Sequence, residues 1–295
     1  MATRCLKDSC IYSTYSLQFY LLFPLVKVGQ FIGLPPLLGY IVALTGPIIL
    51  LELLAITRPH QANSVEHYPK PIYHRSSSMT IGVVVISAIL GLLCQIGISF
   101  VAERSQPHLI PLGIYLILLS FFHFSEYFVT SLTNPNTLNL SSFLIDQSIA
   151  YVLAISFSFV EYVTEVYAFP QFKKFNLIAL VGLLLTISGE IMRKLAMFTA
   201  GRNFSHTIST RKCAEHKLVT HGIYGLLRHP SYTGWFYWAL GTQILLQNPL
   251  CFVMFAVISH QFFKDRIVYE EAMLIEFFGS EYQEYRGRVG IWMPI

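Results

Sequence analysis

The stretch 228–263, RHPSYTGWFYWALGTQILLQNPLCFVMFAVISHQFF, decides the fold of this chain. Its first residues form a polar turn that stands directly against an apolar run. Pro230 favours the start of a helix, because the N–H group that proline lacks would be unpaired at that position. His229, as the residue before proline, favours extended backbone. We predict a sharp loop-to-helix corner here, although the turn taken alone could equally be an interfacial turn with Arg228 as a basic anchor.

The apolar part of this stretch is divided by Asn248-Pro249 into two runs, 231–247 and 249–263. As helices these runs are about 22–26 Å long, which is short for a hydrocarbon core of roughly 30 Å. We therefore predict a tight helical hairpin whose Asn-Pro turn lies shallow in the membrane or is buried against other helices. Because the hairpin returns the chain to the side where it began, the segments that flank it become neighbours.

Composition places the whole chain in a membrane. Of its 295 residues, 54% are hydrophobic and only 12% are charged, whereas a soluble domain carries about 25% charged residues. We predict an all-α, polytopic integral membrane protein with about eight transmembrane helices and a cytosol-facing C-terminal region that holds the polar chemistry. The predicted spans are 11–34, 36–57, 79–102, 107–131, 143–165, 175–200, 231–247 and 249–263.

The distribution of lysine and arginine predicts the orientation. An even number of spans leaves both termini on one side, and most basic residues fall in the connections on that same side. By the positive-inside rule this side is cytosolic. Arg104, Lys173 and Lys174 lie on the opposite side and do not fit the rule. The first span lacks a small-residue cleavage site, so we expect it to remain as a membrane helix.

Two parts of the chain differ in character. Residues 1–200 are nearly all predicted span, and residues 201–295 hold most of the polar residues around the hairpin. The net charge of +4 is small and scattered, so we expect no nucleic-acid partner. The five cysteines form no CxxC pair and lack metal-ligand spacing. This pattern predicts free thiols, without a disulfide framework or a metal site.

Polar segments flank the hairpin on both sides. Arg266 and Glu270 lie four residues apart and so share a helix face. His229 and Tyr232 lie three residues apart at the opposing corner. We predict that these side chains line one pocket at the lipid boundary. The alternative is that Arg266 and Glu270 form a simple i,i+4 ion pair worth about 0.2–0.5 kcal/mol.

Other polar residues of the C-terminal region admit simpler roles. Tyr282 and Tyr285 are typical of an interfacial belt or of helix packing. His216 and His221 could be solvated loop residues.

Polar residues within the earlier spans favour ion pairs or hydrogen-bonded pairs. His123 and Glu126 lie three residues apart and are interpreted as a satisfied intramembrane pair, since one His-x-x-Glu is too little for a membrane di-iron site. Glu190 has Arg193 and Lys194 at i+3 and i+4, which predicts an interfacial ion pair.

The last third of the chain resembles the protein-S-isoprenylcysteine O-methyltransferase family, also called isoprenylcysteine carboxyl methyltransferases. The resemblance rests on residues 216–224, on the corner 228–238, on the hairpin and on the tail 266–285. Arg-His-Pro-x-Tyr alone is shared more widely among membrane methyltransferases and sterol reductases. Beyond Arg288 the tail departs from the family pattern.

The resemblance implies methyl transfer from S-adenosylmethionine to the C-terminal carboxylate of a farnesylated or geranylgeranylated cysteine, with S-adenosylhomocysteine as the second product. It implies prenylated CaaX proteins, such as Ras- and Rho-type small GTPases and lamins, as substrates in the endoplasmic reticulum membrane. Arg266 would bind the substrate carboxylate as the catalytic residue. The cofactor would be held by His216, Lys217, Leu218, Val219, Tyr224, His229, Pro230, Ser231, Tyr232 and Glu270.

Two other functions compete with this one. A membrane sterol or steroid reductase would use a similar corner and tail but would bind NADPH. A transporter would place its ionisable residues near the middle of the membrane, whereas here they cluster at one surface.

Overall fold

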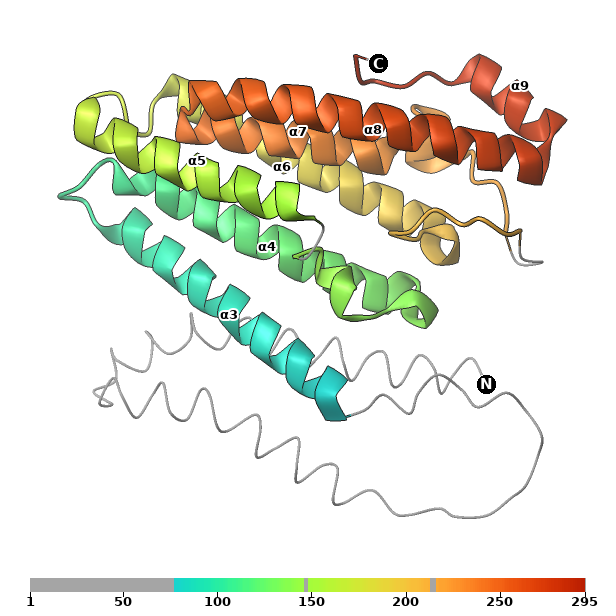
Figure 1. Ribbon diagram of the computed structural model, residues 1–295, viewed down its shortest axis with the longest axis horizontal. Coiled ribbons are helices and arrows are strands. Elements are labelled where there is room, and N and C mark those ends of the chain that lie inside the picture. Colours follow the sequence, from blue (N-terminus) through green and yellow to red (C-terminus); the bar gives the residue numbers. More distant parts are fainter. Residues whose placement is uncertain (1–76, 146–147, 213–215, 295) are drawn as a thin grey trace.

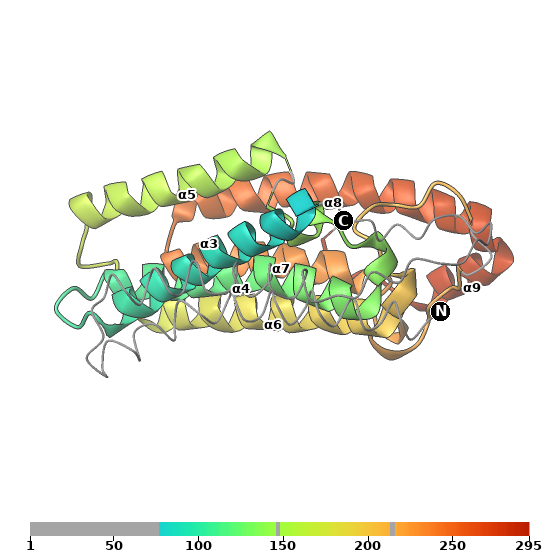
Figure 2. The same ribbon diagram turned by 90° about the horizontal axis from the view of Figure 1, so that it is seen from below.

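The computed structural model describes residues 77–145, 148–212 and 216–294. The first two predicted spans, 11–34 and 36–57, lie outside these residues. All regular structure in the described part of the chain is helical, as predicted. Six long helices run side by side, and a short one follows at the C-terminal end (Figures 1 and 2). They are α3 (Ser77–Ala102), α4 (Leu109–Thr133), α5 (Ile149–Ala168), α6 (Leu177–Ala200), α7 (Pro230–Leu246), α8 (Pro249–Phe278) and α9 (Ser280–Arg288), with short 3₁₀ turns at Pro135–Thr137, Leu140–Phe143, Gly201–Asn203 and Gly222–Gly225.

Three of the described helices are long and apolar enough to cross a membrane, namely α3, α4 and α5. The first of these candidate spans is Met79–Ala102, which coincides with the predicted range. Many of their apolar side chains face outward, for example Ile149 and Val160 of α5, which are 80% and 61% exposed. Such a surface suits lipid rather than water.

Small residues let α6 and α7 approach each other closely. A Cβ atom at Gly189 would lie 2.5 Å from the carbonyl oxygen of Gly234, and one at Gly182 would lie 2.2 Å from the backbone nitrogen of Leu245. Neither distance is tolerable, so glycine is required at both positions. Close backbone approach through small residues is a common way to pack membrane helices. It fixes α7, and with it the polar corner, against α6.

The Asn-Pro turn between α7 and α8 is buried, as one of the two predicted placements requires. Asn248 is 1% exposed, and its amide donates to the backbone oxygen of Ser158 on α5 at 2.8 Å. Lys173 donates to the oxygens of Leu246 and Gln247, both at 2.8 Å, and is itself buried. Its charge stabilises the carbonyl end of α7. Lys173 therefore has a structural role at the hairpin turn.

The predicted end of the second hairpin helix at residue 263 is wrong. α8 has 30 residues and ends at Phe278, so it is about 45 Å long. The apolar run stops at 263 because charged residues follow it, but those residues are good helix formers and include no glycine or proline. Gly279, with φ +56°, ends the helix. The polar residues from 264 to 271 therefore belong to the same helix as the hairpin.

Candidate functional site

The corner before α7 opens onto a cavity of about 130 Å³, called the main cavity below. α7 begins at Pro230, and His229 before it is non-helical, with φ −123° and ψ 60°. The backbone N–H of Thr233 donates to the His229 oxygen at 3.0 Å and so closes the first turn. The predicted site residues that line the main cavity are Lys217, Leu218, Val219, Tyr224, His229, Pro230, Ser231, Tyr232 and Glu270.

Two further hollows contain the remaining predicted site residues. His216 lines a neighbouring hollow of about 100 Å³ that shares Lys217 and Glu270 with the main cavity. Arg266 lines a hollow of about 450 Å³, called the outer cavity, together with His206 and residues of α8. All the predicted site residues therefore lie in one region, where α7, the middle of α8 and the segment 216–219 meet.

Arg266 and Glu270 do not form the simple ion pair that was the alternative prediction. The Nε atom of Arg266 donates to the Tyr232 hydroxyl at 2.9 Å, and its Nη2 atom donates to the backbone oxygen of His206 at 2.5 Å. Glu270 lies with Oε2 at 3.7 Å from Nδ1 of His229. That Glu270 oxygen is buried and accepts no hydrogen bond from the described residues. A buried carboxylate oxygen without a donor is rare in folded proteins and needs an explanation.

Glu271, the next residue, forms ion pairs and hydrogen bonds with other parts of the protein. Its carboxylate accepts from Nε of Arg228 at 2.9 Å and from Nε2 of His229 at 3.2 Å, and Arg286 of α9 lies 3.1 Å away. Burial alone would raise the pKa of the Glu271 carboxyl, but hydrogen bonds from His229 and Arg228 outweigh it and lower the pKa to about 2. Glu271 thus joins α8 to the corner and to α9.

The interpretation of Arg228 as an interfacial anchor is wrong. Besides its bond to Glu271, Arg228 donates through Nη1 to the backbone oxygens of Arg286 and Val289. Its side chain is only 11% exposed. A guanidinium can make several bonds in a fixed geometry, and here it holds the C-terminal segment against the corner.

Sequence reasoning missed the residues that follow α6. Asn203, Phe204 and Ser205 line the main cavity, and Oδ1 of Asn203 accepts from the backbone N–H of Lys217 at 2.9 Å. Nothing in the local pattern marks them, because their role depends on a contact with a distant segment.

The two tyrosines of α9 pack inside the protein rather than in an interfacial belt. Tyr282 and Tyr285 are 1% and 4% exposed and line the main cavity. Burial raises the pKa of Tyr285 to about 12, so its phenol stays protonated. It donates to the backbone oxygen of Tyr224 at 2.6 Å.

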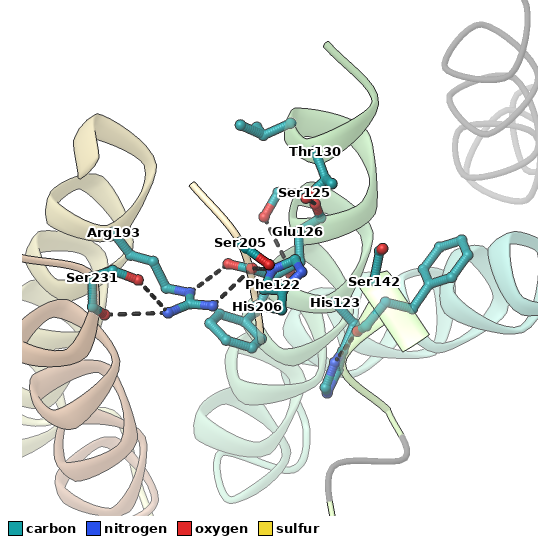
Figure 3. A network of polar contacts seen from close by, with 12 residues as sticks. Phe122, His123, Ser125, Glu126, Thr130, Ser142, Arg193, Ser205, His206 and Ser231 are labelled. Carbon is teal, nitrogen blue, oxygen red and sulfur yellow. Dashed lines mark hydrogen bonds and ion pairs between the residues drawn. The ribbon is translucent and has the colours of Figure 1, made fainter. Parts of the chain in front are cut away.

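Glu126 is the centre of a buried ionic network that joins α4, α6 and the segment after α6 (Figure 3). Arg193 donates to it through Nε at 2.6 Å and Nη2 at 2.9 Å. Lys194 contributes Nζ at 2.5 Å and His206 contributes Nε2 at 2.9 Å. We call Glu126, Arg193, Lys194 and His206 the Glu126 network.

This network overturns two predicted pairs. His123 does not bond Glu126, since its ring nitrogens contact the Phe143 oxygen at 2.8 Å and the Tyr151 hydroxyl at 3.0 Å. Arg193 pairs with Glu126 of another helix instead of Glu190. The predicted pair of Glu190 with Lys194 is confirmed at 3.2 Å. Spacing within one helix predicted the Arg193 contact wrongly because Glu126 on α4 competes for the same cation, and it predicted the His123 contact wrongly because Phe143 and Tyr151 supply the partners of that ring.

Comparisons with known proteins agree with this geometry. The sequence model of the isoprenylcysteine carboxyl methyltransferase family matches residues 180–276, which run from α6 through the corner to Arg266 and Glu270. The protein-S-isoprenylcysteine O-methyltransferase of Homo sapiens is 44% identical over 214 residues, covering 72% of this chain and 74% of that protein. The enzyme of the same name from Saccharomyces cerevisiae is 44% identical over 218 residues, with 72% and 90% covered.

A solved structure is similar over nearly the whole chain. It is that of the eukaryotic intramembrane Ras methyltransferase, an isoprenylcysteine carboxyl methyltransferase, determined without a monobody. The TM-score is 0.77 at 33% identity, and the match covers 99% of this chain and 97% of that one. Relatives with this identity and coverage, together with a cavity built by the matched segment, show that the chain belongs to the isoprenylcysteine carboxyl methyltransferase family.

Proposed function

We propose that this membrane methyltransferase esterifies the C-terminal carboxylate of a prenylated cysteine, with S-adenosylmethionine as the methyl donor. The observation that carries the proposal is the placement of Glu270 and Arg266 one helical turn apart on α8, each at a cavity. One offers an unpaired carboxylate oxygen and the other a guanidinium. The Glu270 carboxylate suits a cationic methyl donor, and the Arg266 guanidinium suits an anionic methyl acceptor.

The main cavity fits the methyl donor in chemistry. S-adenosylmethionine supplies, when bound, a methyl group on a positively charged sulfur. The buried Oε2 atom of Glu270 can accept a hydrogen bond from an ammonium or hydroxyl group of a ligand, and this would remove the penalty for burying it unpaired. Leu218, Val219 and Tyr224 give the cavity an apolar and aromatic lining for an adenosine group. His216, Lys217, His229, Pro230, Ser231 and Tyr232 complete the proposed donor site.

Arg266 is suited to hold the substrate carboxylate. Two of its nitrogens are fixed by Tyr232 and by the backbone of His206, and the third, Nη1, has no hydrogen bond to a described residue. A guanidinium whose orientation is already set binds a carboxylate with little further loss of freedom. Arg266 lines the outer cavity and also a small hollow that it shares with Ser231 and Tyr232 of the main cavity, so the substrate can approach from the outer side.

The chemistry asks little of the protein beyond alignment. A cysteine α-carboxyl group, with a pKa of about 3.5, is already ionised at neutral pH, so no general base is required. Transfer of a methyl cation equivalent to a carboxylate neutralises both charges. Such a reaction is faster where water is excluded, and the apolar lining of Leu218 and Val219 serves this purpose. Arg266 and Glu270 supply the alignment.

The remaining features of the proposal concern the setting. We place the enzyme in the endoplasmic reticulum membrane, with eight spans, both termini and the main cavity on the cytosolic side, and residues 201–295 as the catalytic region. Prenylated CaaX proteins, including Ras- and Rho-type GTPases and lamins, are the proposed substrates. The prenyl chain would approach sideways between the helices.

The direct test uses the purified full chain in nanodiscs with methyl-labelled S-adenosylmethionine and N-acetyl-S-farnesylcysteine. We expect label to appear in a base-labile methyl ester. Failure to form the ester with both farnesyl and geranylgeranyl substrates would overturn the proposal. Oxidation of NADPH with a sterol and without methyl transfer would select the reductase instead, although the named relatives are methyltransferases.

A further inference from the structure

The Glu126 network touches the proposed site at two points. Ser231, in the first turn of α7, accepts a hydrogen bond from Nη1 of Arg193 at its hydroxyl, 2.7 Å away, and lines the main cavity. His206, whose ring bonds Glu126 at 2.9 Å, uses its backbone oxygen to accept from Arg266 at 2.5 Å. Glu126 itself lines neither the main nor the outer cavity.

Glu126 is the common partner of both connections. Its side chain is completely buried and accepts from Arg193, Lys194 and His206. Figure 3 shows Arg193 lying between Ser231 and Glu126, and His206 beside the same carboxylate. A carboxylate that accepts several charge-assisted bonds holds its donors firmly, because each bond is stronger where water is absent.

The contact of Glu126 with His206 affects the orientation of the Arg266 guanidinium. The segment after α6 has no regular structure at 204–207, so side-chain contacts set the position of the His206 backbone oxygen. These are the bond from the Asn134 amide to the neighbouring Phe204 oxygen at 2.8 Å and the contacts of the His206 ring itself. The ring is held by Glu126 and lies 5.4 Å, edge to face, from the ring of Phe204. The two described partners of Arg266 are that oxygen and the Tyr232 hydroxyl. Loss of the Glu126 contact would therefore free one of the two groups that orient the Arg266 fork.

We infer that Glu126 is a positioning residue for carboxylate recognition, acting through His206 on Arg266. It never touches substrate. The inference rests on the proposed role of Arg266. If Glu126 only stabilised the fold, its replacement would lower stability but leave the discrimination between a carboxylate and its ester unchanged in the folded variant. A positioning residue also affects that discrimination.

Glu190 provides a matched control. It is a second buried carboxylate of the same region, and it contacts Lys194 at 3.2 Å, as Glu126 does. Its other bond comes from the Ser125 hydroxyl at 2.8 Å, and among the described residues it bonds neither Arg193 nor His206. Glu190→Gln therefore removes one carboxylate charge beside Lys194 of the network without touching the connection to Arg266.

The experiment measures binding of N-acetyl-S-farnesylcysteine and of its methyl ester to the full chain in nanodiscs by calorimetry, with S-adenosylhomocysteine present. The readout is the affinity ratio of acid to ester. We expect the wild type to prefer the acid, Glu126→Gln to lose about tenfold or more of this preference, and Glu190→Gln to keep it. Arg266→Ala provides the affinity ratio expected when the preference for the acid is completely lost.

A second variant covers the case in which Glu126→Gln does not fold. His206→Ala leaves the Arg193–Glu126 pair intact and should lower the same ratio. If the wild type prefers the acid to the ester and a folded Glu126→Gln or His206→Ala variant keeps the same affinity ratio, the inference is wrong while the proposed role of Arg266 stands. An equal loss in Glu190→Gln also overturns the inference. A wild type without preference for the acid refutes the role of Arg266, and this inference with it.

Discussion

Glu270 and Glu271 are adjacent carboxylates for which the structure predicts opposite effects of the same substitution. Glu271 accepts from Arg228 and His229 and lies beside Arg286, so it joins three segments. Glu270 has a buried oxygen without a described hydrogen bond. We predict that Glu271→Gln lowers the thermal stability of the protein, whereas Glu270→Gln leaves it unchanged or raises it slightly.

The size of the Glu271 effect follows from its pKa. The pKa falls from its ordinary value of 4.5 to about 2 in the folded protein. At about 1.4 kcal/mol for each pH unit, this corresponds to roughly 3 kcal/mol of stability at pH 7. A loss of that size lowers the unfolding midpoint of a protein domain by roughly 5 °C or more. Because the folded pKa is lowered, the contribution is fully present above pH 4.5 and is lost as the pH falls through 2.

The assay is thermal unfolding of the purified protein in detergent at several pH values. The difference between wild type and Glu271→Gln should be largest at pH 7 and should narrow below pH 4.5. Glu270→Gln should instead weaken binding of S-adenosylhomocysteine about tenfold, as expected for one lost charge-assisted bond. Equal midpoints for Glu271→Gln and wild type at pH 7 would refute the reasoning, as would a difference that does not depend on pH.

Three further outcomes can be checked with the same protein. Arg266→Ala should abolish methyl transfer while S-adenosylhomocysteine still binds in calorimetry; a near-wild-type rate of labelled methyl transfer would contradict the role of the guanidinium. Gly182→Ala should destabilise the protein by about 1–3 kcal/mol, because α6 and α7 would be forced apart, and Gly287→Ala, with no atom within 4 Å of the new methyl group, serves as the control in the same unfolding assay. Lys173→Met should lower the unfolding midpoint clearly, since three oxygens at the end of α7 and the turn lose their donor. As a control, Lys174→Met on the exposed neighbour should leave the midpoint within roughly 1–2 °C of wild type, the effect of a surface change. Equal midpoints for the two variants would show that the buried ammonium group of Lys173 is dispensable.

The sequence was sufficient to predict the corner and the hairpin because both depend on local chemistry. Pro230 starts α7, as predicted, and Asn248 lies in a buried turn, which was one of the two predicted placements. The end of α8 was missed because hydropathy marks where lipid contact ends, and a helix can continue beyond that point. Helix propensity in 264–278 could have indicated the continuation.

The ionic partners could not be predicted from spacing. Glu126 lies 67 residues from Arg193 and 80 from His206, so their contact depends on how the helices pack. The i,i+4 rule found the Glu190–Lys194 pair but gave no warning that Arg193 prefers another helix. Asn203 and its neighbours were missed for the same reason. In this chain local rules predict the elements, and tertiary packing decides which charges meet.

The continuity of α8 has an evolutionary consequence. On the proposed roles, Arg266 and Glu270 position acceptor and donor from one unbroken helix, with Cβ atoms about 5–6 Å apart. Mutations at Thr207 and Ile208, which line the outer cavity but lie outside α8, can reshape that cavity without altering the separation. New prenyl or peptide preferences can therefore arise in this family while the distance over which the methyl group moves is inherited unchanged.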